Sequence, residues 1–65
     1  MDDGTAKMVA DAYDETVSEA IAQGRAAEIA HKEGITAAAM FFASMTGVQD
    51  AAARTEVEAL GLSPH

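Results

Sequence analysis

Apolar residues recur at helical spacing through the first half of the chain. At 100° per residue, one face carries apolar or small side chains and the opposite face carries polar ones. The apolar stripe contains Ala6, Val9, Tyr13, Val17, Ala20, Gly24, Ala27 and His31, and the polar face contains Lys7, Asp11, Asp14, Glu15, Ser18, Arg25 and Lys32. The pattern predicts one amphipathic helix from about Asp3 or Thr5 to Glu33. Gly34 then fits a left-handed helix end.

The next segment has no charged residue. Residues 36–45 are TAAAMFFASM, and Thr36 suits the N-cap of a helix that returns antiparallel to the first. A helix that is apolar on every side is buried on every side, yet the first helix can cover only one of its sides. We therefore expect a second copy or another protein to cover the rest. The predicted self-association interface consists of Met40, Phe41, Phe42 and Met45.

Two structures are open beyond this segment. Thr46 and Gln49 match a capping box, which predicts a new helix after Gly47. Otherwise the second helix continues unbroken, with Gly47 as a weak point. We favour a break. The core side of residues 48–60 would contain Ala53, Val57 and Leu60, and Gly61 fits the end of that helix.

These elements predict an all-α fold, an antiparallel helical hairpin with a short third helix if the chain breaks at Gly47. Residues 1–62 would form one domain and residues 63–65 a disordered tail. Chains near 60 residues bury a smaller fraction of their surface than larger domains do, and they are marginally stable alone. The chain has no cysteine for disulfides, so we expect dimerisation into a four-helix-type bundle.

The chain is acidic, with 11 acidic against 4 basic residues and a net charge of −7. This balance disfavours direct nucleic-acid binding through bulk positive charge. The polar face of the first helix carries Asp11, Asp14, Glu15 and Glu19, and we expect this acidic face to bind a larger, basic protein. Small inhibitors from phages and mobile elements are similar in general character. The alternative is that the charge only keeps an Ala-rich dimer soluble.

Composition also bears on location. The longest uncharged run, residues 35–49, is shorter than the roughly 20 residues that a bilayer span needs. The N-terminus is acidic, unlike the basic start of a signal peptide. The absence of cysteine fits a reducing compartment. We therefore expect a cytoplasmic protein that does not bind membranes.

One pair of residues has a metal-ligand spacing. Glu28 and His31 form the Glu-x-x-His unit that di-iron helical bundles use. The facing segment, residues 35–49, has no carboxylate to complete such a site, so we expect His31 to be half-buried and hydrogen-bonded to a carbonyl or to its dimer mate instead. The sequence also lacks a Ser-His-Asp or Cys-His arrangement and a phosphate-binding glycine loop. We predict no cofactor, no metal and no enzymatic activity.

Residues 43–48, Ala-Ser-Met-Thr-Gly-Val, resemble the turn of the helix-turn-helix family of DNA-binding proteins. Residues that suit the buried positions of that family are Phe42, Ala53 and Val57. Thr46 and Glu56 depart from it, because the family has apolar residues there. The resemblance implies that residues 48–57 form the recognition helix, in which Arg54 is outnumbered by carboxylates.

The sequence thus predicts a non-enzymatic protein that acts by protein–protein interaction, as a homodimeric regulator or inhibitor of a larger protein. Two alternatives from other classes remain. One is a helix-turn-helix regulator that binds DNA weakly, and the other is a metal-binding helical bundle.

Overall fold

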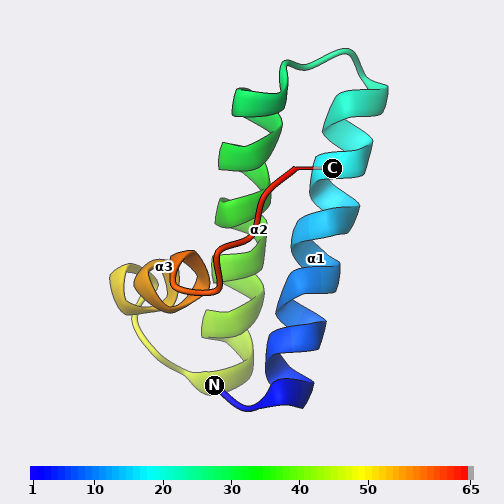
Figure 1. The fold of residues 1–65 in the computed structure, drawn as a ribbon. Helices are drawn as coiled ribbons and strands as arrows, with labels where there is room; N and C mark the ends of the chain where they lie inside the picture. The colour runs from blue at the N-terminus through cyan, green and yellow to red at the C-terminus, as the bar shows by residue number, and fades with distance from the viewer. Residues whose placement is uncertain (65) are drawn as a thin grey trace.

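The computed structural model describes residues 1–64, which form three α-helices (Figure 1). α1 spans Asp3–Ala22, α2 spans Ala27–Thr46 and α3 spans Asp50–Glu58. α1 and α2 lie side by side and run antiparallel, and α3 packs against the lower part of α2 in the view of Figure 1. The all-α class and the third helix are confirmed. The four-helix dimer stays a prediction.

The hairpin turn lies at residues 23–26, and its predicted position at Gly34 is wrong. Gly24 has a φ of 91°, in the left-handed region that favours glycine. The backbone N–H of Arg25 donates to the carbonyl of Ala20 at 3.0 Å, which closes the end of α1. Because the chain turns here, Ala27 and His31 belong to α2 and do not continue the stripe of α1.

Gly34 is buried inside α2, at the closest approach between the two long helices. A Cβ atom at this position would lie 2.6 Å from Val17 Cγ2 and 2.7 Å from Tyr13 Cδ2. Its role is therefore to let α1 and α2 come close together. Thr36, the predicted N-cap, is also interior to α2, and its hydroxyl donates to the carbonyl of Lys32 at 3.0 Å.

The predicted break at Gly47 is confirmed. Gly47 has a φ of 80° and ends α2. The predicted capping box does not form, because the hydroxyl of Thr46 donates back to the carbonyl of Phe42 at 2.8 Å. Within residues 1–64 the N-cap of α3 is Gln49, whose side chain makes no cap hydrogen bond.

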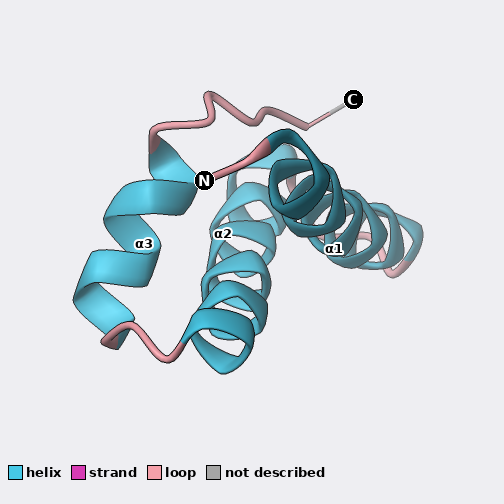
Figure 2. Cartoon of the chain, turned by 90° about the horizontal axis from the view of Figure 1, so that it is seen from below, coloured by secondary structure: helices cyan, strands magenta, loops and turns pink. Residues whose placement is uncertain are grey.

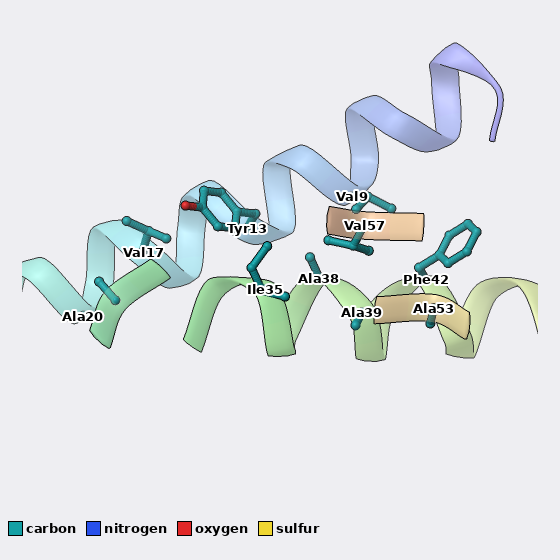
Figure 3. Close-up of a cluster of buried hydrophobic side chains, with 11 residues drawn as sticks. Val9, Tyr13, Val17, Ala20, Ile35, Ala38, Ala39, Phe42, Ala53 and Val57 are labelled. Atoms are coloured by element: carbon teal, nitrogen blue, oxygen red, sulfur yellow. The ribbon is translucent and has the colours of Figure 1, made fainter. Parts of the chain in front are cut away.

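The core lies where the three helices meet (Figure 3). Its largest fully buried side chains are Tyr13, Val9 and Val57. The other buried hydrophobic residues are Val17, Ala20, Ala30, Ile35, Ala38, Ala39, Phe42 and Ala53. Ala53 and Val57 hold α3 on the core, and Leu60 is half-buried against it, as predicted.

The segment after α3 runs back across one face of the α1–α2 pair (Figures 1 and 2). Gly61 has a φ of 71°, in agreement with its predicted role at the helix end. Leu62 packs against the core, so this face of the hairpin is covered by α3 and by the chain that follows it. The prediction of a disordered tail at 63–65 stays untested, and His65 lies outside the described residues.

Candidate functional site

The structure divides the predicted self-association interface. Met40 is 65% exposed, Phe41 38% and Met45 41%, whereas Phe42 is only 4% exposed. Phe42 shares the core-facing side of α2 with Ile35 and Ala38, at helical spacing, so it belongs to the core of the chain (Figure 3). The three exposed residues are left without cover by the chain itself. Whether a second copy covers them stays a prediction.

Helix geometry places Met8 of α1 beside this exposed surface. Met8 lies about 100° before the buried Val9 and about 140° from the middle of the buried stripe of α1, and Phe41 lies about 100° before the buried Phe42. In an antiparallel helix pair, the residues that precede the core residues of each helix by one position lie on the same side of the pair. Met8 lies five residues after the start of α1, and Phe41 five residues before the end of α2. The two side chains therefore lie on the same side of the hairpin and at the same level, with Met8 turned further outwards.

We call Met8, Phe41 and Met45 the hairpin patch. Met8 is 45% exposed, close to the values of the other two. The patch lies on the side of the hairpin opposite α3. On the α3 side, Ala39 of α2 lies beside Ala51 and Arg54 of α3. Met40 is about 100° from Phe41 around α2 and lies next to the α2–α3 groove instead.

Towards the turn, the same side of the hairpin carries polar residues on α1 and the half-buried Ala37 on α2. Ala12, Glu15 and Glu19 follow Met8 at four, seven and eleven residues, which keeps them in line on α1. Gly34 and Ala30 of α2 are buried against α1 and are not open to this side. Near the turn lies a hollow of about 200 Å³ lined by Thr16, Glu19, Ala20, Gln23, Arg25 and Glu33.

The hollow near the turn is acidic. Arg25 Nε and Glu33 Oε2 form an ion pair at 2.9 Å. Glu19 Oε1 accepts a weak hydrogen bond from Gln23 Nε2 at 3.4 Å. Glu19 is exposed, so together with the Arg25–Glu33 pair it leaves a net negative charge at this hollow.

Only one residue of the predicted acidic face lines this hollow. Glu19 lines it, whereas Asp11 and Glu15, four residues apart, are exposed on the outer side of α1. Asp14 is half-buried and lines a separate hollow of about 280 Å³ with Val17 and Ile21, on the opposite side of α1. The four carboxylates therefore do not form one continuous surface.

His31 is hydrogen-bonded to Tyr13. The Tyr13 hydroxyl and His31 Nδ1 lie 2.6 Å apart, and the two rings meet edge to face. The neighbouring Glu28 faces Lys32, with 3.8 Å between Oε1 and Nζ. Across residues 1–64, no group of three or more His, Asp or Glu side chains is placed to hold a metal ion.

The α2–α3 connection has the form that the helix-turn-helix resemblance implies, with a three-residue turn at 47–49 and steeply crossed helices (Figure 2). The surface of α3 is not basic, however. Arg54 Nη2 donates to Thr36 Oγ1 at 3.1 Å and so joins α3 to α2. Asp50, Glu56 and Glu58 are exposed on the same helix. This arrangement gives a DNA backbone little to bind.

None of the helices in residues 1–64 combines the length and the apolar character of a membrane span. No protein-family model, no curated protein and no solved structure matches the chain. The function is therefore argued from its own residues.

Sequence reasoning missed one residue of the candidate surface, Met8. Its spacing from Glu15 and Glu19 is visible in the sequence, but its pairing with Phe41 depends on where the hairpin turns. A turn at Gly34 would have placed Met8 and Phe41 at different levels. Met8 can therefore be assigned to this surface only after the turn is known to lie at residues 23–26.

Proposed function

We propose that this chain is a non-enzymatic interaction module, which regulates or inhibits a larger protein by binding it through the hairpin patch. The supporting observation is the exposure of Met8, Phe41 and Met45 on one side of a hairpin whose opposite side is covered by α3. Phenylalanine and methionine are adaptable apolar anchors that recur in grooves for partner helices. Their exposure on a fully packed chain is costly unless a partner covers them.

Self-association would compete with a larger protein for the same patch, and it is the interaction that the sequence predicts for Phe41 and Met45. Two copies packed patch to patch would make a four-helix bundle and would supply the burial that a chain of 65 residues lacks. Light scattering over a dilution series to low micromolar concentration tests it. A constant mass near twice 6.7 kDa supports self-association, and a mass of one chain at every concentration contradicts it.

The proposed function is tested by a pull-down experiment in which two matched variants and the wild-type chain serve as baits. Phe41→Glu places a charge in the hairpin patch, and Met40→Glu places the same charge on the neighbouring, more exposed residue outside it. We expect the wild-type chain and Met40→Glu to retain the same binding protein, and Phe41→Glu to lose it. Complexes rebuilt from purified components then give the stoichiometry by light scattering.

The fold of each bait is checked by far-UV circular dichroism before binding is compared. Equal retention of the partner by Phe41→Glu, with its helices intact, would contradict the proposal. So would loss of binding in Met40→Glu alone, because the contact would then lie on the α2–α3 side of the molecule.

A further inference from the structure

The segment after α3 is held in place differently from the rest of the chain. Residues 62–64 run from the end of α3 across the α1–α2 pair (Figures 1 and 2). We propose that these residues form a strap, which opens and closes about Gly61 on a three-helix core that stays folded. The inference is independent of the proposed function, because the strap lies on the α3 side of the hairpin and the hairpin patch lies on the opposite side.

Hydrogen bonds fasten the chain to α3 only as far as Gly61. The backbone N–H of Gly61 donates to the carbonyl of Glu58 at 3.2 Å. Beyond it, no hydrogen bond joins residues 62–64 to any other part of residues 1–64. Opening the strap therefore breaks no hydrogen bond within the described chain, whereas opening any of the three helices breaks several.

The strap is also held by little apolar packing. Leu62 packs against the core but is only half-buried, and Ser63 beside it is exposed. Val57, which holds α3 on the same core, is fully buried. One half-buried leucine removes far less apolar surface from water than the helix interfaces do. The closed strap is therefore a weakly held cover, of the kind that opens locally while the rest of a domain stays folded.

Gly61 has the conformational freedom that a hinge needs. Its φ is 71° when the strap is closed, and glycine adopts left-handed and extended conformations about equally well. The chain can therefore leave the closed path at this residue without backbone strain. A Cβ atom added at Gly61 would meet no atom within 4 Å, so alanine there would disfavour the closed path through φ alone.

The chain has only two leucines, Leu60 before the hinge and Leu62 after it, so the strap has a methyl signal of its own. In a chain labelled with ¹³C at the leucine and valine methyl groups, the signals of Leu62 and Val57 are followed by NMR as urea is added. We expect the Leu62 signal to move towards its unfolded position at urea concentrations that leave Val57 and the helical circular dichroism unchanged. Coincident changes of Leu62 and Val57 would overturn the inference, because the segment would then open only with the whole core.

Gly61→Ala and Gly24→Ala are a matched pair that tests the hinge. Both glycines have positive φ, and neither added Cβ would meet an atom within 4 Å. We expect Gly24→Ala to raise the equilibrium constant of unfolding by about tenfold, because the hairpin turn cannot relax without separating α1 from α2, and Gly61→Ala to raise it by about threefold at most. In Gly61→Ala the Leu62 signal should lie near its unfolded position, with Val57 unchanged.

Two results would each overturn the hinge at Gly61. One is a Leu62 signal that keeps its wild-type position in Gly61→Ala, because the closed path would then tolerate alanine. The other is a loss of stability in Gly61→Ala equal to that in Gly24→Ala, because strain at residue 61 would then be relieved only by unfolding the core.

Discussion

Tyr13 joins the two long helices at the centre of the molecule. Its side chain is fully buried, its ring lies where a side chain at residue 34 would have to go, and its hydroxyl meets His31 Nδ1. A buried phenol needs a hydrogen-bond partner, because an unpaired one loses the free energy of its hydration. His31 supplies that partner from α2. One residue of α1 thus fixes both the spacing and the register of the hairpin.

The first prediction concerns Gly34→Ala. Alanine inside a helix is normally more stable than glycine by about 1 kcal/mol. Here the added Cβ would overlap the Tyr13 ring and Val17, with contacts under 3.0 Å. We expect the substitution to lower the free energy of unfolding by about 1–3 kcal/mol, measured by urea denaturation followed by circular dichroism.

Gly4→Ala is the matched control in α1. The nearest atom to its added Cβ is Asp2 Oδ1 at 3.8 Å, an ordinary contact. We expect this substitution to leave stability unchanged or to raise it slightly. A gain in stability from Gly34→Ala equal to that from Gly4→Ala would show that α1 and α2 are not in close contact at Tyr13.

The second prediction concerns alkaline pH. Burial, followed by the negative charge of Asp14, raises the pKa of Tyr13 above its ordinary value of 10.0. Because the pKa of Tyr13 is higher in the folded chain than in the unfolded chain, the neutral phenol contributes to the free energy of unfolding below pH 10. This contribution is lost as the pH rises through the pKa of Tyr13 in the folded chain. We expect the tyrosinate absorbance near 295 nm to rise above pH 10, together with loss of helical circular dichroism.

The chain suits this measurement because it has one tyrosine and no tryptophan. The same chain in concentrated urea serves as the control and should titrate near 10. Ionisation at that value in the folded chain, with its helices intact, would show that the phenol is exposed.

At the scale of elements, Gly47 decides whether residues 36–58 form one helix or two. The third prediction is that Gly47→Ala destabilises the chain by about 1 kcal/mol or more, because a φ of 80° places Cβ too close to the following carbonyl. Gly47→Asn is the control, since asparagine adopts this conformation more easily. Thermal unfolding of both variants checks it. An equal loss in both variants would show that backbone conformation at this position is not what matters.

The helices were predictable from the sequence and the hairpin turn was not. The apolar spacing of Val9, Tyr13 and Val17 predicts the buried face of α1, and Ala53 with Val57 predicts that of α3. Gly24 and Gly34 look alike in the sequence, yet Gly24 turns the chain and Gly34 allows close packing. The difference arises from tertiary contacts with Tyr13, which local spacing does not contain. A turn at residues 23–26 gives two arms of 20 residues that can pair along their whole length.

At the scale of the whole molecule, α3 and the chain after it make the two sides of the hairpin different. They cover one side with Ala53, Val57 and Leu62, while the other side exposes the hairpin patch. Sequence reasoning predicted that α2 needs more cover than one helix provides, and it named Phe41 and Met45. The sequence could not show that Phe42 is buried while Phe41 and Met45 are exposed, since all three lie in one uncharged run. The distinction depends on where α3 packs.

The fourth prediction uses the methionines as reporters of the binding surface. In a chain labelled with ¹³C at the methionine methyl groups, the signals of Met8, Met40 and Met45 are followed by NMR, first on dilution of the chain alone and then during addition of the protein that the wild-type bait retains. Met8 and Met45 belong to the hairpin patch. Met40 is the most exposed of the three but lies outside it, so it is an internal control.

We expect the Met8 and Met45 signals to shift or broaden together as the surface is covered, whether by a second copy or by the retained protein, while Met40 stays unchanged. A response of Met40 without Met8 and Met45 would place the contact on the α2–α3 side. No response of any of the three in either titration would contradict the hairpin patch as a binding surface.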